Sequence, residues 1–144
     1  VDRLWIKGLI HARTSLDPTE AIKLLRTEME KYPDSFKNIY RILPIQRLVS
    51  TRIEEIAETT QTLAENIPED DSFRITLEKR RTDLHSREVI ERVAQDIDRS
   101  VDLEEPDWIL LVEIMGDITG ISVIKPNEML NIQKEKYALS RRGD

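Results

Sequence analysis

A cluster of basic side chains near the middle of the chain is the best candidate for chemistry in this sequence. Residues 72–94 read SFRITLEKRRTDLHSREVIERVA, and residues 72–92 hold six Lys or Arg against four Asp or Glu. The chain as a whole carries a formal net charge of −6 at pH 7, so positive charge is concentrated locally. Local arrangement sets the field at a surface, so a basic face can coexist with an acidic total. The run therefore predicts an anion-binding, and specifically a phosphate-binding, surface.

The candidate phosphate ligands lie on or just after a predicted strand over residues 72–80, which a helix follows. Arg87 falls in the first turn of this helix, where a cation opposes the macrodipole and so suggests an outside anion. Free backbone N–H groups after Ser86, the predicted N-cap, are themselves suited to an anion. The candidates are Arg74, Lys79, Arg80, Arg81, His85, Ser86 and Arg87, to which Lys125, Lys134, Lys136, Arg141 and Arg142 of the C-terminal segment could contribute.

The alternative is that the basic residues form ordinary surface ion pairs. In that interpretation Arg80 and Arg81 pair with nearby acidic side chains on a solvated helix and loop. The available partners are Glu78, Asp83, Glu88 and Glu91. Charge alone leaves both interpretations open.

Other kinds of site find little support. The chain has no Cys and only two His, so thiolate chemistry is excluded and a zinc or iron site is not indicated. None of the four Gly has the spacing of a phosphate-binding loop. Ser86 follows His85 but reads as a helix cap rather than a nucleophile. We therefore expect no catalytic residue, no metal and no cofactor.

A second charged segment is acidic. Residues 93–124 hold eight Asp or Glu and one Arg, and six of the acidic residues fall within residues 96–107. This segment lacks the alternating oxygens and central Gly of a calcium-binding loop, so we interpret it as a solvated acidic loop. No apolar run approaches the roughly 20 residues of a membrane span, and we expect a cytoplasmic protein without a membrane partner.

Hydrophobic periodicity predicts alternating strands and helices. The helix that starts at Asp17 and Pro18 and ends at Pro33 has an apolar face of Ala21, Ile22, Leu24, Leu25 and Met29. A second helix has Ser50 or Thr51 as its cap and ends at Pro68, and a third places Val89, Ile90, Val93, Ala94 and Ile97 on one face. The predicted strands are residues 3–13, 36–51, 72–80, 106–116 and 117–126, the last two joined by a turn at Gly116 and Asp117.

This order predicts an α/β (α+β) fold with a mixed sheet. The best boundary lies near Val49–Arg52, which gives an N-terminal region 1–50, a domain 51–130 and a tail 131–144. A helical turn is expected from Asn127, and the rest of the tail is not assigned.

The segments SFRITLEKRRTDLHSREVIERVAQDI and VDLEEPDWILLVEIMGDITGISVI resemble the THUMP domain. The upstream TSLDPTEAIKLL and YRILPIQRLVSTRIEEIAETTQTLA resemble the region that precedes it in archaeal proteins of that group, so the resemblance covers about residues 14–130. It implies a THUMP fold preceded by a partial ferredoxin-like strand-helix-strand region. It also implies binding of tRNA, with the basic run facing the phosphodiester backbone.

The resemblance suggests three possible roles. The chain could be an adaptor that presents tRNA to an RNA cytidine acetyltransferase, with the acceptor stem and 3′ CCA end as contacts. It could be the RNA-binding part of a thiouridine synthase or methyltransferase, or a scaffold with little RNA affinity. Arg41 is a further candidate RNA ligand, whereas Trp5, Tyr40 and Trp108 are expected in the core or at a domain interface.

Overall fold

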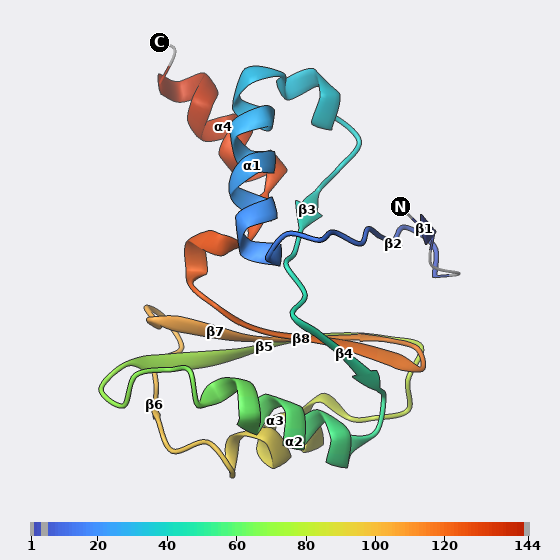
Figure 1. Ribbon diagram of the computed structural model, residues 1–144, viewed down its shortest axis with the longest axis vertical. Helices are drawn as coiled ribbons and strands as arrows, with labels where there is room; N and C mark the ends of the chain where they lie inside the picture. The colour runs from blue at the N-terminus through green and yellow to red at the C-terminus, as the bar shows by residue number, and fades with distance from the viewer. Residues whose placement is uncertain (1, 4–5, 143–144) are drawn as a thin grey trace. The chain divides into compact units, whose positions relative to one another are not determined.

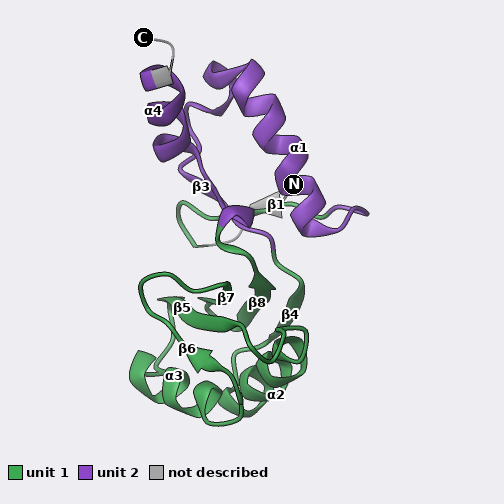
Figure 2. Cartoon of the chain, turned by 90° about the vertical axis from the view of Figure 1, so that its left-hand side faces the viewer, with its two compact units in different colours: residues 1–13, 45–126 green, residues 14–44, 127–144 purple. Residues whose placement is uncertain are grey.

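The computed structural model describes residues 2–3 and 6–142 and divides the chain into two compact units (Figure 2). Unit 1 consists of Val1–Arg13 and Ile45–Pro126, and unit 2 of Thr14–Pro44 and Asn127–Asp144. This division differs from the ranges 1–50, 51–130 and 131–144 expected from sequence. Residues from both ends of the chain join in unit 2, a long-range association that composition and periodicity do not report.

Unit 1 contains a mixed sheet of five strands in the order β4-β8-β7-β5-β6. The strands are β4 (Arg47–Ser50), β5 (Ser72–Arg80), β6 (Ser100–Val101), β7 (Trp108–Met115) and β8 (Ile118–Ile124). β5 runs parallel to both β6 and β7, whereas β8 runs antiparallel to β7 and β4. The predicted mixed sheet and α+β class are confirmed.

Two helices, α2 (Ile53–Ala64) and α3 (Ser86–Ala94), cover one face of this sheet (Figure 1). Alternate side chains of β5, β7 and β8 point toward them, as the period of two in SFRITLEKR predicts. Phe73, with 1% of its surface exposed, is the largest side chain of this core. The buried members are Ile56, Leu63, Ala64, Ile67, Phe73, Val89, Val93, Leu110, Val112, Ile114, Ile121 and Val123.

One helix-face prediction is wrong. Val89 and Val93 are buried, but Ile90, which was expected beside them, is 36% exposed. Successive residues of a helix are about 100° apart, so with Val89 and Val93 directed at the sheet Ile90 is turned to the helix flank.

The hairpin between β7 and β8 forms as predicted. Met115 pairs with Ile118 across a two-residue turn, and Gly116 adopts a positive φ of 67° that favours glycine. β7 is buried along Ile109–Ile114, as expected for a continuously apolar strand covered on both sides. This strand therefore fixes the centre of the sheet.

In unit 2, α1 (Pro18–Lys31) packs with α4 (Ile132–Arg142). α1 begins as predicted, because the Asp17 side chain accepts a hydrogen bond from the Thr19 backbone N–H at 2.9 Å. Ile22 and Met29 are buried, but Leu24 is 60% exposed and does not belong to the expected apolar face. The core of this unit is Ile22, Met29, Phe36, Leu130 and Ile132.

The C-terminal segment is more ordered than the sequence indicates. After the short 3-10 turn η2 (Pro126–Glu128), β9 (Leu130–Asn131) pairs antiparallel with β3 (Arg41–Ile42), and α4 follows directly. Arg26 of α1 holds this segment through an ion pair of 2.6 Å from its Nε to Glu135 Oε1 and through bonds to two backbone carbonyls. Conventional apolar periodicity is weak in α4, which explains why it was missed.

Two predicted strands are each interrupted. Residues 36–51 form the end of the 3-10 helix η1 (Pro33–Phe36), then β3 and β4 on either side of Pro44, because proline lacks the N–H that a continuous ladder needs. In place of the predicted strand 3–13 there are two short strands, β1 (Asp2–Arg3) and β2 (Ile10–His11), which pair antiparallel, and Gly8 has a φ of 87° between them. Trp5, expected in the core, lies outside the described residues.

No helix in the described part of the chain is both long enough and apolar enough to cross a membrane.

Candidate nucleic-acid interface

The basic residues at the end of β5 differ in burial: Lys79 and Arg81 are exposed, whereas Arg80 is partly buried. Its Nη1 lies 2.8 Å from Glu113 Oε2 on the neighbouring strand β7, with 24% of the Arg80 side chain and 4% of the Glu113 side chain exposed. The sequence interpretation had offered only local acidic partners for Arg80. The actual partner is 33 residues away, so only strand pairing brings it near.

Lys79 and Arg81 lie at the surface on either side of Arg80. The Lys79 ammonium donates to the Leu84 carbonyl oxygen at 3.0 Å and so stabilises the loop between β5 and α3. Arg81 has a φ of 54°, which residues other than glycine rarely adopt. Its positive φ turns the chain out of the sheet directly after β5, and the Arg81 side chain is exposed.

α3 begins one residue earlier than its predicted cap allows. The N-cap is His85, not Ser86, and no side-chain oxygen caps the helix; Ser86 is the first helical residue. The first backbone N–H groups of α3 are therefore not satisfied by a cap side chain, and such groups attract anions. The predicted cap of α2 is also wrong, because its N-cap is Arg52.

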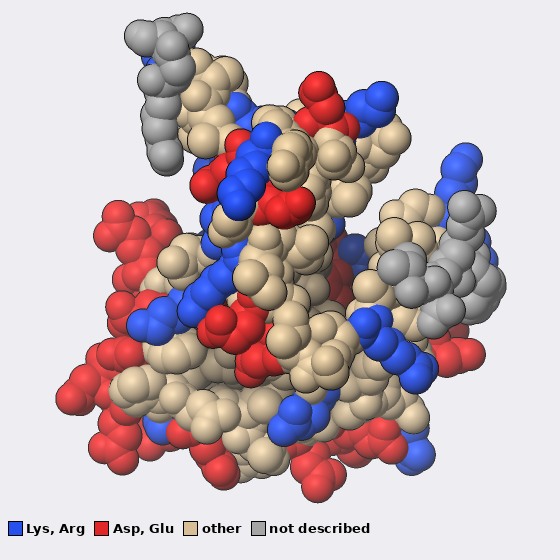
Figure 3. Space-filling view, turned by 45° about the horizontal axis from the view of Figure 1, so that its top comes forward, with Lys and Arg blue, Asp and Glu red and all other residues tan. Residues whose placement is uncertain are grey.

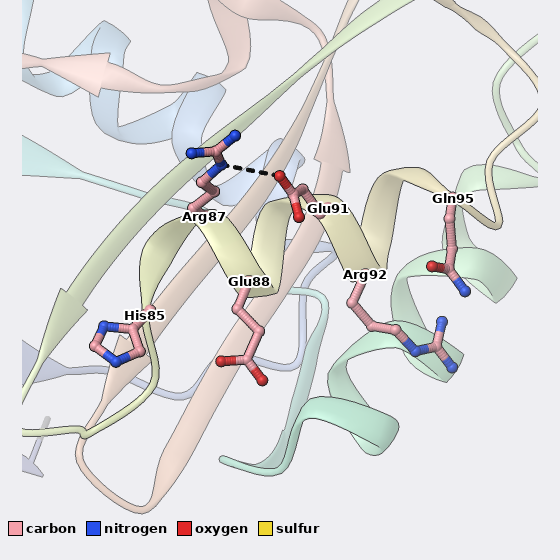
Figure 4. Close-up of a pocket in the computed structure, with 6 residues that line it drawn as sticks. All are labelled: His85, Arg87, Glu88, Glu91, Arg92 and Gln95. Carbon is pink, nitrogen blue, oxygen red and sulfur yellow. Dashed lines mark hydrogen bonds and ion pairs between the residues drawn. The ribbon is translucent and has the colours of Figure 1, made fainter.

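Arg87 is exposed and paired on its own helix. Its Nε lies 3.0 Å from Glu91 Oε1, with 91% of the Arg87 side chain exposed, so this pair contributes at most about 0.5 kcal/mol. Figure 4 shows Arg87 and Glu91 on one side of α3 and Glu88 and Arg92 on another. Together with His85 and Gln95 they line a surface depression of about 430 Å³, whose mixed charge does not by itself select an anion.

Two further predicted ligands have local roles in unit 1. Arg74 donates from Nη1 to the Leu103 carbonyl oxygen at 3.1 Å. The Lys125 ammonium lies 5.1 Å from the centre of the Trp108 ring, a cation–π contact, and the Trp108 Nε1–H donates to Asp71 Oδ2 at 2.9 Å. Trp108 is half-buried against the core, as expected.

The remaining candidates belong to unit 2. Arg41 is exposed on β3, and Lys134 and Lys136 lie on α4, whose Arg141 contacts the Tyr137 ring; the side chain of Arg142 lies outside the described part. Tyr40 is 76% exposed beside Arg41, so it does not pack in the core, one of its two expected positions; the other, a domain interface, stays a prediction. Exposed aromatics of this kind were not anticipated, because the sequence pattern around Tyr40 resembles a strand.

The structure thus brings five of the candidates into one continuous stretch: Lys79, Arg81, His85, Ser86 and Arg87, which we call the β5–α3 patch. On the face seen in Figure 3, Lys and Arg side chains are interspersed with Asp and Glu rather than joined in one large area. The patch is therefore a local feature of an acidic protein.

The acidic segment behaves as a structured loop. The Asp102 carboxylate accepts hydrogen bonds from the backbone N–H groups of Glu105 and Glu104, each at 3.0 Å, and these bonds lower the pKa of Asp102. Within the described ranges, no group of three or more His, Asp or Glu side chains is arranged to hold a metal ion.

The sequence of residues 50–124, more than half of the chain, matches the THUMP domain. The chain belongs to the THUMP domain family. The THUMP match covers β5 to β8, α2, α3 and the whole β5–α3 patch, and it includes the last residue of β4.

Among curated proteins, none matches this THUMP chain significantly in sequence. Several solved structures are similar to it. PH1313 from Pyrococcus horikoshii is 26% identical, with a TM-score of 0.48, over 60% of this chain and 33% of that one. TrmN from Thermus thermophilus is 17% identical, with a TM-score of 0.50, over 78% of this chain and 33% of that one.

A 4-thiouridine synthetase, solved with RNA and bound ATP, is 19% identical, with a TM-score of 0.45, over 55% of this chain and 24% of that one. The chain thus spans a third or less of the length of these three proteins. At its level of identity, the likeness to TrmN indicates a shared fold and no more.

Proposed function

We propose that this chain binds tRNA through the β5–α3 patch and acts as a non-catalytic module for tRNA modification. The observation that carries the proposal is the position of the patch inside a THUMP domain. Lys79, Arg81 and Arg87 are exposed: Lys79 donates to Leu84 just before α3, Arg81 follows β5, and Arg87 lies in the first turn of α3, whose N–H groups no side chain caps. Phosphodiester oxygens are acceptors for both kinds of donor.

The patch is suited to a backbone rather than to a buried small anion. Lys79 and Arg87 make only exposed, weak local contacts, so a phosphate can replace these contacts at little cost in free energy. An Arg guanidinium can bind phosphate in a bidentate manner and can stack on an unpaired base. Arg80 is the least suitable of the predicted ligands, because a bound phosphate would have to compete with the buried Glu113 carboxylate.

Unit 2 offers a second kind of contact. Tyr40 presents an exposed ring next to Arg41, and stacking on an aromatic ring is a common way to hold an unpaired base. Arg41, Lys134 and Lys136 supply charge on the same unit. We propose that these residues contact a single-stranded part of tRNA, such as its 3′ CCA end.

The modification enzyme that this module serves is proposed from family resemblance. An RNA cytidine acetyltransferase, which forms N4-acetylcytidine, is our first candidate for the partner. A thiouridine synthase or methyltransferase of which the chain is a part is the second. Reconstitution distinguishes them: the purified chain should raise acetylcytidine formation in tRNA by such an acetyltransferase, and no stimulation would remove that partner.

The binding proposal is tested by titrating the purified chain with a native tRNA pool and with the same pool trimmed of its 3′ CCA. Binding that falls with salt and weakens on trimming supports recognition of the acceptor end. Equal and salt-independent weak binding of both pools would instead favour a scaffold role.

A further inference from the structure

β5 extends well beyond its outer neighbour in the sheet. It spans Ser72–Arg80 and pairs with β7 along Phe73–Arg80 on one side. On its other side, β6 pairs only with Ser72 and Phe73. Among the residues that the structure describes, no strand therefore pairs with the outer edge of β5 from Arg74 onward.

The geometry of the ladder identifies the backbone groups on this edge. The Asp102 N–H donates to the Phe73 carbonyl on the β6 side, whereas the Gly116 N–H donates to the Arg80 carbonyl on the β7 side. Alternate residues of a strand direct their N–H and C=O to opposite neighbours. Ile75, Leu77 and Lys79 must therefore direct both groups outward, and no described residue forms a hydrogen bond with these groups.

The edge is left open by a specific turn. β6 ends after Val101, where the Asp102 carboxylate accepts the backbone N–H groups of Glu104 and Glu105. This turn ends the backbone pairing with β5, and among the described residues its Leu103 carbonyl accepts only from the Arg74 side chain. The opposite edge of the sheet is shorter, because β4 has four residues and the N–H of Ser50 is satisfied by Glu55.

The side chains along the open edge define what could bind there. Ile75 and Leu77 are only half-buried against the core, so they present apolar surface beside the edge. Arg74 and Lys79 lie at the two ends of this stretch, and Arg81 follows it. Glu78 is the acidic side chain of the strand. The edge is thus apolar at its centre and cationic at its Lys79–Arg81 end, whereas the acidic loop that contains Leu103 lies beside Arg74 at the other end.

We propose that the outer edge of β5 at Ile75–Lys79 docks an extended acidic peptide segment of a protein partner, which adds to the sheet as a further strand. Main-chain hydrogen bonds would supply affinity, and alternate side chains would supply specificity. Apolar side chains of the peptide would cover Ile75 and Leu77, and its carboxylates would meet Lys79 and Arg81. The site binds protein rather than RNA, but it shares Lys79 and Arg81 with the β5–α3 patch, so peptide and tRNA would compete for these two side chains.

Two other occupants fit the edge less well. RNA donates hydrogen bonds only from its 2′-hydroxyls and bases, which do not repeat at the spacing of a strand, so RNA does not match the alternating N–H and C=O groups of this edge. A second copy paired antiparallel about Leu77 would set Arg74 opposite Arg80 of the other copy and Ile75 opposite its Lys79. Like charges directly opposite each other destabilise such a pair.

The test uses the whole ¹⁵N-labelled chain and a synthetic peptide that alternates valine with glutamate, added to millimolar concentration. Two control peptides replace glutamate by lysine or methylate alternate backbone nitrogens. We expect the acidic peptide to shift the amide resonances of Ile75, Leu77 and Lys79 and to slow their hydrogen exchange about tenfold. The amides of Arg74, Thr76 and Glu78, which bond to β7, should keep their exchange rates.

Two variants of the chain test the backbone contact and the charge contact separately. Leu77→Pro removes an outward N–H without removing a bond to β7, and Lys79→Glu reverses the charge at the edge; each should weaken peptide binding about tenfold. If Leu77→Pro fails to fold, Lys79→Glu still tests the proposal. The proposal is overturned if the acidic peptide leaves these amides unchanged, or if the lysine peptide binds equally well. The proposal is also overturned if tRNA, and not the peptide, shifts the amide resonances of Ile75, Leu77 and Lys79.

A tRNA titration of the same sample tests the proposed tRNA binding separately from peptide docking. The unmodified chain and the Leu77→Pro variant should bind tRNA alike. Loss of tRNA binding without loss of peptide binding would count against the function and not against the docking edge.

Discussion

Arg80 on β5 and Glu113 on β7 form an ion pair of 2.8 Å, with the Glu113 side chain almost fully buried in the sheet. Removing one partner of such a pair leaves an uncompensated charge in a poorly solvated place. Arg80→Ala should therefore lower the free energy of unfolding by about 3 kcal/mol, measured by urea denaturation. Lys79→Ala is the matched control and should change stability by less than about 0.5 kcal/mol. Equal effects of the two changes would contradict a structural role for Arg80.

The same pair changes how the RNA surface should be probed. Arg80→Glu would place two carboxylates in contact and destabilise the sheet, so a loss of affinity in that variant would not identify an RNA ligand. Charge reversals at Lys79, Arg81 and Arg87, whose side chains are exposed, avoid this confusion.

The flank of α3 gives a second prediction. Val93→Asp should prevent cooperative folding, because Val93 is 1% exposed and its carboxylate would have no partner in the core. Ile90→Asp should melt within a few degrees of the unmodified chain, because Ile90 is 36% exposed. Circular dichroism melts compare the two. A cooperatively folded Val93→Asp chain would contradict the assigned helix face.

Sequence reasoning predicted the local features better than the long-range ones. The period of two in residues 72–80, the cap at Asp17 and the Gly116 turn each depend on neighbouring residues, and the structure contains them. By contrast, the partner of Arg80 and the pairing of β3 with β9 join residues far apart in sequence. The exposure of Tyr40 is not indicated by the sequence, because residues 36–51 have a β-rich composition on both sides of Pro44 although the strand is interrupted there.

The cap of α1 provides a pH-dependent prediction. Hydrogen bonds from the Thr19 hydroxyl and backbone N–H lower the pKa of Asp17 below its usual value of 3.8. The ionised cap therefore contributes stability above that value, and the contribution is lost as the pH falls through the pKa of the folded state. Asp17→Ala should cost about 1 kcal/mol near neutral pH, and this difference should shrink in acid.

Asp17→Asn is the control for the cap, because its side chain still accepts a hydrogen bond but does not titrate. The difference in free energy of unfolding between Asp17→Asn and Asp17→Ala should therefore stay the same in acid. Denaturant unfolding of the three proteins across pH measures both effects. A difference between Asp17 and Asp17→Ala that is unchanged in acid would contradict the role of the carboxylate.

The exposed ring of Tyr40 gives a prediction about unpaired bases. If the ring stacks on a base, Tyr40→Ala should raise the dissociation constant for tRNA about tenfold, since such stacking is worth about 1–3 kcal/mol per base. Tyr40→Phe should bind like the unmodified chain. Tyr32→Ala, which removes another exposed tyrosine of unit 2, should have little effect. A similar loss in the Tyr32 variant would indicate a nonspecific effect.

The central claim is that the β5–α3 patch binds the tRNA backbone. The most direct measurement is the affinity for a native tRNA pool over a salt series, for the unmodified chain and a Lys79→Glu, Arg81→Glu double variant. A Lys23→Glu, Lys31→Glu double variant, which reverses two exposed cations of α1, changes the net charge by the same amount and is the control. We predict that the double variant binds at least tenfold more weakly and has a smaller salt slope, because it has lost phosphate contacts. Equal affinity and equal slope in the double variant and the unmodified chain would contradict the claim.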